Sequence, residues 1–154
     1  MIMLLLLTLL TLLTRPTLLQ TTILEQQVVP FMQEQVMVVN GKRLALEIAD
    51  EPDEITQGLS DRESMPRGHG MLFVFNQADV YPFWMNRMHF PLDIIWINDG
   101  VVVDIVTLPP PKFGEVPRTY TPKNAADTVL ELNAGEAAER GLRVGAPVDG
   151  LDVF

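Results

Sequence analysis

Two acidic residues stand inside apolar segments of this sequence. Asp93 lies between a leucine and an isoleucine, and Glu131 lies between two leucines. A buried carboxylate is costly unless it is hydrogen-bonded or paired. We therefore take Asp93 and Glu131 as candidate catalytic residues. Together they could form the acid–base pair of a glycosidase-like hydrolase, provided that their carboxyl groups lie roughly 5–9 Å apart.

Both acids also have structural interpretations. Asp93 could cap loop amides or pair with Arg62 or Arg87, and structural ion pairs often produce such residues. Glu131 could point to water from a half-exposed strand. The acid–base hypothesis requires both carboxylates to converge in one cleft beside Arg62 or Arg87. It fails if the two side chains lie on opposite faces of a sheet, and we favour the structural interpretation.

Histidine offers a different chemistry. His69 and His89 are the only histidines, and Asp93 follows His89 by four residues. Two histidines and a carboxylate can bind a transition metal. Helical spacing would align His89 with Asp93, but Pro91 lies between them and argues against a helix. We therefore expect no metal site and no cofactor; the acidic segment 50–54 also lacks the glycine of a calcium loop.

Residues 83–90 are rich in aromatic and methionine side chains. Such a cluster usually belongs to the core, where sulfur and aromatic rings pack well. On the surface the same segment would form the wall of a shallow groove for a sugar or a peptide. We predict that most of the cluster is buried. We nevertheless take five residues as candidate ligand-binding residues, namely Arg62, Trp84, Arg87, His89 and Asp93.

The composition narrows the functional classes. The chain has 154 residues, of which 47% are hydrophobic and 20% charged, and these values are typical of one globular domain. It has no cysteine, which excludes disulfides and thiolate chemistry. The net charge of −9 repels phosphate backbones. We therefore expect no nucleic-acid partner.

The first residues differ in composition from the rest. Residues 1–13 are mostly leucine, as in the apolar part of a secretory signal. We predict an apolar leader over residues 1–24, either a signal peptide or a membrane anchor, followed by a linker over residues 25–35. A single globular domain should then fill residues 36–154. This organisation implies an extracytoplasmic protein, and the alternatives for the leader are a misassigned start or an amphipathic tail.

Hydrophobic periodicity predicts short strands and two short helices. Asn40-Gly41 and Asp99-Gly100 have the composition of tight hairpin turns. Residues 108–122 contain five prolines and should form a long extended loop. The expected strands cover residues 36–39, 43–49, 71–75, 92–97, 101–107, 128–132 and 148–153, and the expected helices cover residues 52–58 and 136–140. The predicted class is mostly-β or α+β, a compact antiparallel-rich sheet or barrel-like domain with two short helices.

Several segments together resemble a known family. They are Gly70-Met71-Leu72-Phe73-Val74-Phe75, Phe83-Trp84-Met85, residues 90–96 and residues 129–135. Their order and spacing resemble the signature of the domain of unknown function 192 family, whose members are often exported prokaryotic proteins. The resemblance implies one compact sheet-containing domain and no particular activity. Relatives usually have a lysine where this chain has Asn86 followed by Arg87.

These observations lead to a functional hypothesis. We expect a non-enzymatic binding or scaffolding domain at the cell envelope, with the proline-rich loop and residues 83–93 as its working face. Its partner would be an envelope protein, peptide or glycan. The alternatives are a small hydrolase of an envelope polymer that uses Asp93 and Glu131, and a structural partner of a membrane complex tethered through residues 1–24.

Overall fold

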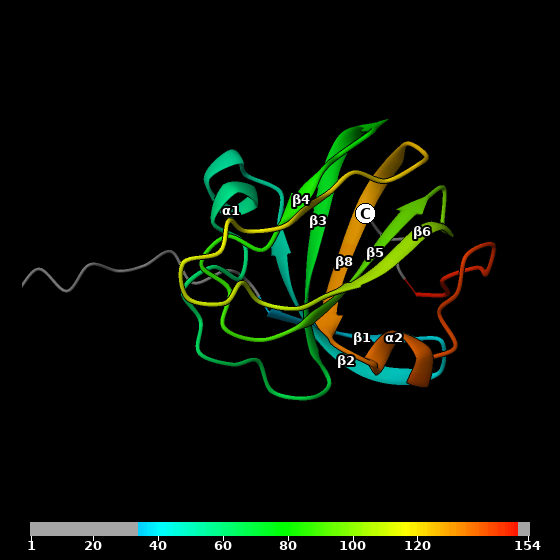
Figure 1. Ribbon diagram of the computed structural model, residues 1–154. Helices are drawn as coiled ribbons and strands as arrows, with labels where there is room; N and C mark the ends of the chain where they lie inside the picture. Colours follow the sequence, from blue (N-terminus) through cyan, green and yellow to red (C-terminus); the bar gives the residue numbers. More distant parts are fainter. Residues whose placement is uncertain (1–33, 151–154) are drawn as a thin grey trace, which may run out of the picture. The chain divides into compact units, whose positions relative to one another are not determined.

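The computed structural model describes residues 34–150 (Figure 1). The predicted leader over residues 1–24, most of the predicted linker and the end of the last expected strand lie outside the described residues. Within residues 34–150, no helix is both long and apolar enough to cross a membrane.

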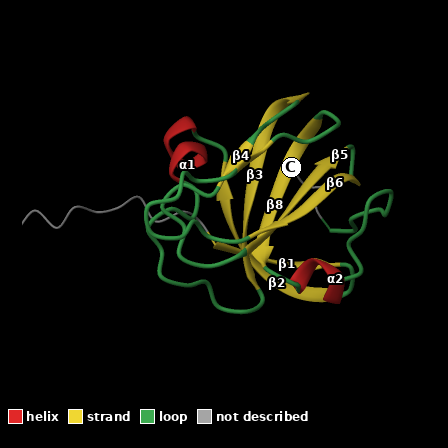
Figure 2. Ribbon diagram, viewed as in Figure 1, coloured by secondary structure: helices red, strands yellow, loops and turns green. Residues whose placement is uncertain are grey.

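A six-stranded mixed sheet forms the framework (Figure 2). In spatial order its strands are β1 (Glu34–Val39), β2 (Lys42–Ala49), β3 (His69–Asp79), β8 (Ala126–Asn133), β5 (Leu92–Asn98) and β6 (Val101–Leu108). Only β2 and β3 pair in parallel, and the other neighbours are antiparallel. Because β1 and β6 are the two edges, the described sheet is open rather than a closed barrel. The predicted mostly-β, antiparallel-rich class is confirmed.

Both predicted hairpins form as the sequence indicates. The φ angles are +48° at Asn40 and +75° at Gly41, and +48° at Asp99 and +68° at Gly100. Two successive positive φ angles define the tight turn whose twist matches that of paired strands. These turns fix the register of β1 on β2 and of β5 on β6.

Two short helices and a small ribbon complete the described fold. Helix α1 (Pro52–Gln57) starts at a proline and carries acidic residues in its first turn. Helix α2 (Glu136–Glu139) follows β8 directly. The strands β4 (Phe83–Trp84) and β7 (Thr119–Tyr120) pair with each other. Figure 1 shows α1 beside β4 near one end of the sheet and α2 near the other end, beside β1 and β2.

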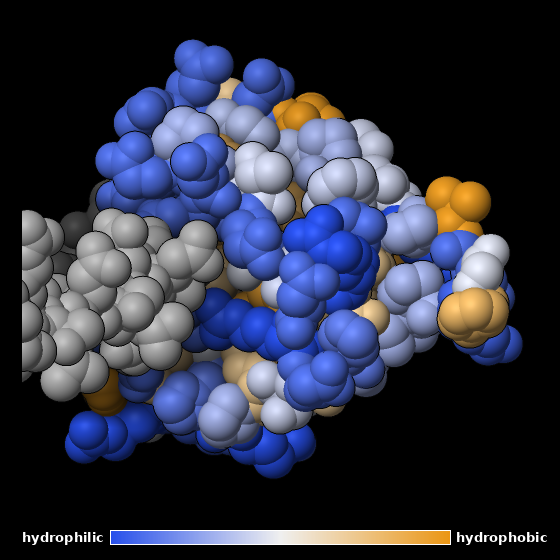
Figure 3. Space-filling view, turned by 90° about the vertical axis from the view of Figure 1, so that its left-hand side faces the viewer, coloured by the Kyte–Doolittle hydropathy of each residue, from blue (hydrophilic) through white to orange (hydrophobic). Residues whose placement is uncertain are grey.

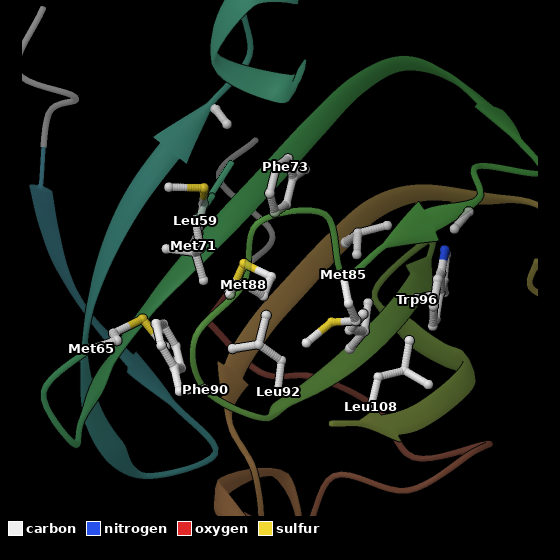
Figure 4. Packing of buried hydrophobic residues seen from close by; sticks show 14 residues of the cluster. Leu59, Met65, Met71, Phe73, Met85, Met88, Phe90, Leu92, Trp96 and Leu108 are labelled. Carbon is white, nitrogen blue, oxygen red and sulfur yellow. The ribbon is translucent and has the colours of Figure 1, made fainter. Parts of the chain in front are cut away.

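The sheet has an apolar core on each face. Alternate residues of β3 and β5 point to opposite sides, so that Met71 and Ile94 belong to one cluster and Leu72 and Ile95 to the other. We call these the α1-side core and the α2-side core. The segments around α1 and β4 cover the first core, and α2 with residues 142–148 covers the second. The loop after β4 places Met85 and Met88 over the sheet in the α1-side core (Figure 4).

Three expectations about the elements need correction. Residues 148–150 do not form a strand, because Pro147 has no N–H for a ladder and makes only an isolated bridge with Val101. The proline-rich segment is not entirely loop, since Thr119–Tyr120 forms β7 after the prolines at 109–111 and 117. The parallel pairing of β2 with β3 was not expected from the hairpin turns.

Candidate functional site

Glu131 occupies the centre of the sheet on the α1 side. Its neighbours in register are Met71 on β3 and Ile94 on β5, and both belong to the α1-side core. The residue is only 4% exposed. Burial and the charge of Arg62 are the main influences on its carboxyl group. The expectation that Glu131 points to water is therefore wrong, because segments around α1 and β4 cover this face.

A small cavity lies against Glu131. Its volume is about 30 Å³, and it is partly open to solvent. The sheet contributes Phe73 and Glu131 to the lining. The covering segments contribute residues 55–60 from α1 and the following turn, together with Phe83, Trp84 and Met88. We call this cavity the Glu131 pocket.

Gly58 and two aromatic rings belong to the lining of the Glu131 pocket. Gly58 ends α1 with a φ of +48°, which L side chains rarely adopt. A Cβ atom at this position would lie 3.4 Å from the ring of Phe73, which is an ordinary contact distance. Phe73 lies edge-to-face against Phe83, with ring centroids 4.8 Å apart.

An ion pair lies beside the pocket but does not engage Glu131. Arg62 forms a bidentate pair with Glu47 of β2, and its second nitrogen lies 2.7 Å from Oε2 of that residue. Glu47 is in register with Met71, which in turn is in register with Glu131, so the two glutamates share the same face of the sheet. Arg62 is thus close enough to influence Glu131 electrostatically while its hydrogen bonds go to Glu47.

Burial controls the ionisation of Glu131. Loss of hydration raises the pKa of this carboxyl group from 4.5 to about 8, and the positive charge of Arg62 offsets part of that rise. The side chain is therefore largely protonated at neutral pH. A carboxyl group with a strongly raised pKa inside a cavity is typical of a functional site.

Asp93 has a different environment. It lies in β5 opposite Leu132, on the α2 side of the sheet, and is 3% exposed. One carboxyl oxygen accepts a hydrogen bond from the hydroxyl of Thr107 at 2.6 Å. The other accepts from the backbone N–H groups of Gly135 at 2.7 Å and Ala137 at 3.0 Å. Asp93 therefore fixes the turn into α2, as the loop-capping interpretation predicted.

The structure does not bring Asp93 and Glu131 together. The two carboxylates lie on opposite faces of the sheet. Glu131 is in register with Ile94 of the α1-side core, whereas Asp93 is in register with Leu132 of the α2-side core. Neither Arg62 nor Arg87 contacts Asp93. The geometric condition for the predicted acid–base pair is not met.

The other candidate residues surround the entrance on the α1 side. Trp84 lines the Glu131 pocket and is 52% exposed. Arg87 pairs with Asp61 at 2.8 Å, and this hydrogen bond lowers the pKa of Asp61. His89 is exposed in the same loop, near enough for its charge to act on Asp61. Most of the aromatic and methionine cluster is buried, as predicted, namely Met85, Met88 and Phe90, and Trp96 of β5 is buried as well.

The two histidines lie apart in the structure. His69 begins β3 beside β2, with its Nδ1 3.9 Å from Glu34, whereas His89 lies in the loop before β5. Within residues 34–150, no three histidines, cysteines or acids are grouped so that they could hold a metal ion.

Some polar residues were not identified from the sequence. Glu47 alternates with Leu46 and Ile48 and resembles an ordinary exposed strand residue, yet it holds Arg62. Glu136 is buried between Arg67 and Arg140 and accepts a hydrogen bond from the N–H of Gly68 at 3.1 Å. Arg62 and Arg67 are distant in the sequence from the glutamates with which they pair, so no local pattern indicates these two ion pairs.

Isolated hydrophobic residues remain on the surface. The face shown in Figure 3 is mostly hydrophilic, and its hydrophobic residues lie in separate spots. The exposed set of large hydrophobic residues is Val36, Val38, Val80, Trp84, Val101, Phe113, Val116 and Val144. Trp84 is the one among them that also lines the Glu131 pocket.

These features define a class of protein: a strand-rich domain with an open mixed sheet and a little-exposed glutamate that lines a small pocket. The chain belongs to the domain of unknown function 192 family (DUF192, "Uncharacterized ACR"), whose model matches residues 35–150. The family resemblance seen in the sequence is thereby confirmed.

Two solved structures are similar to this chain. A protein from Sinorhizobium meliloti, called a "putative transcription regulator", is 30% identical, with a TM-score of 0.63 over 76% of this chain and 92% of its own. A protein of unknown function from Novosphingobium aromaticivorans is 31% identical, with a TM-score of 0.64 over 79% of this chain and 89% of its own. No curated protein matches the chain. The protein is thus a member of an uncharacterised family.

Proposed function

We propose that this protein is a ligand-binding domain of the cell envelope and that the ligand enters the Glu131 pocket. The observation that carries this proposal is the side chain of Glu131, which is only 4% exposed, has a strongly raised pKa and lines a cavity that opens to solvent. A titratable group with a strongly raised pKa in a cavity is a candidate for a functional site. A molecule that enters the opening can hydrogen-bond to this carboxyl group.

The lining favours binding over catalysis. Glu131 is the only titratable side chain among the residues that line the pocket. The hydrolase hypothesis needs a second carboxylate, and Asp93 lies on the other face of the sheet. Trp84 at the entrance offers a large apolar surface to a ligand.

The envelope location rests on the leucine-rich sequence of residues 1–13. The description of the Sinorhizobium relative as a transcription regulator would suggest DNA binding instead. A net charge of −9 disfavours that role for this chain, because DNA recognition depends on clustered basic residues. The proposed ligands are therefore small molecules, peptides or glycans of the envelope.

Thermal unfolding of the full-length protein tests this proposal. The panel contains divalent metals, glycans, envelope peptides, alkylamines and carboxylates. A ligand that binds only the folded state raises the melting temperature, and at 100 times Kd the stabilisation is about 2.7 kcal/mol. Binding in the pocket should also protect the indole of Trp84 from acrylamide, whereas the buried indole of Trp96 is already protected.

A matched pair of variants locates the binding. Trp84→Ala should weaken the interaction, and Phe113→Ala should not, because Phe113 is fully exposed and does not line the pocket. The proposal is rejected if no compound shifts the melting temperature. It is also rejected if Trp84→Ala leaves every interaction unchanged.

A further inference from the structure

We propose that the ligand of the Glu131 pocket carries an organic ammonium group, which donates a hydrogen bond to Glu131 while its apolar stem lies against Phe83 and Trp84. This inference rests on the proposed function, because it names the ligand class for the same pocket. It follows from the chemistry of the floor, the rings and the dimensions of the cavity.

The carboxyl group of Glu131 favours a cationic donor once it loses its proton. An ionised carboxylate is an acceptor only, and its strongest partners are charged N–H donors. Arg62 is the charged side chain that acts on Glu131, but its guanidinium group hydrogen-bonds to Glu47 in a bidentate pair. Apolar surroundings strengthen the attraction between Glu131 and a cation relative to water.

The walls favour a cation as well. Phe73, Phe83 and Trp84 all line the pocket. Aromatic faces attract ammonium groups through their quadrupoles, and clusters of such rings recognise alkylammonium ligands. No lysine, arginine or histidine is part of this lining, so no resident cation competes for the site.

The size of the cavity limits the group that enters. The cavity is small and opens to solvent, so a compact terminal group can reach Glu131 while the rest of the ligand stays at the entrance beside Trp84. A primary ammonium group on an unbranched stem has this shape.

Binding of a cation should be linked to release of a proton. Burial raises the pKa of Glu131 to about 8, so an ammonium ion must displace the proton that the carboxyl group holds at neutral pH. The charged groups facing Glu131 are Arg62 and, through it, Glu47. The lining residues contributed by α1, β3 and β4 carry no charge. Affinity for an amine should therefore rise about 50-fold from pH 6 to pH 8.

The experiment compares three probes of matched shape on the full-length protein: n-butylamine, 1-butanol and butyrate. Dissociation constants are measured from Trp84 fluorescence at constant ionic strength and at pH 6, 7 and 8. We expect butylamine to bind at least tenfold more tightly than butanol at pH 8, and butyrate to bind weakest. In Glu131→Gln the preference for the amine and its pH dependence should disappear.

The control variant is Glu139→Gln, which removes an exposed carboxylate of α2 outside the Glu131 pocket and should change nothing. The wild-type pH series is independent of any variant. If butanol or butyrate binds in the pocket and butylamine does not, binding stands and the ammonium inference is overturned. If no compound of the larger panel binds, as for a pocket that holds only water, the proposed function itself fails.

Discussion

Replacing Glu131 by glutamine should stabilise the protein in alkaline solution and leave it nearly unchanged in acid. Burial raises the pKa of this carboxyl group from 4.5 to about 8 in the folded state. Below pH 4.5 the group is protonated in both the folded and the unfolded chain, so its full contribution to stability is present. Between the two pKa values the unfolded chain has lost the proton that the folded protein still holds.

The magnitude follows from proton linkage. Each pH unit between the two pKa values lowers the free energy of unfolding by about 1.4 kcal/mol. The wild-type protein should therefore lose about 3 kcal/mol by pH 7 and about 4 kcal/mol by pH 9, relative to pH 4.5. Glutamine has a similar shape and no ionisable proton, so Glu131→Gln should escape this loss.

Urea denaturation at pH 5, 7 and 9, followed through the buried indole of Trp96, measures both proteins. The control is Glu136→Gln, because Glu136 is equally buried but has Arg67, Arg140 and the N–H of Gly68 as partners. That variant should be destabilised throughout the pH range. Identical pH profiles for the wild type and Glu131→Gln would refute the account of Glu131 as a carboxyl group whose pKa is raised by burial.

Three further changes probe the framework of the site. Asp93→Ala removes the acceptor of three hydrogen bonds and should cost about 3–5 kcal/mol in urea denaturation. Gly70→Ala places a methyl group 2.7 Å from the backbone oxygen of Glu131 and should cost about 1–3 kcal/mol, seen as a lower melting temperature. Arg62→Met removes the charge that lowers the pKa of Glu131, so that pKa should rise further in a carbon-13 NMR titration. The same change breaks the partly exposed ion pair with Glu47, which should lower the free energy of unfolding by only about 1 kcal/mol. An unchanged Glu131 titration in Arg62→Met would contradict the electrostatic assignment.

Local patterns predicted most of the elements. The turns at Asn40-Gly41 and Asp99-Gly100 have residues that accept positive φ angles, and both hairpins form there. The two helices lie where capping and glycine signals placed them. The parallel pairing of β2 with β3 was missed, because it depends on a crossover through α1 rather than on a turn.

The site was only partly predictable. An acid between two leucines identified Glu131 as unusual, but its burial depends on covering segments far away in the sequence. The same local pattern singled out Asp93, whose partners Gly135 and Ala137 are more than 40 residues distant. Alternation along each strand decides which face a residue occupies, yet only strand pairing shows that these two acids lie on opposite faces.

The position of β8 in the sheet has a consequence for how the chain folds. β8 is the last strand of the described chain, yet it lies between β3 and β5 and joins the β1–β2–β3 unit to the β5–β6 hairpin. The two halves cannot pair within the sheet until residues 126–133 have been synthesised. Such long-range pairing makes folding slow compared with local hairpin formation. A nascent chain would thus remain without the pairing that completes its central core until residues 126–133 have been synthesised.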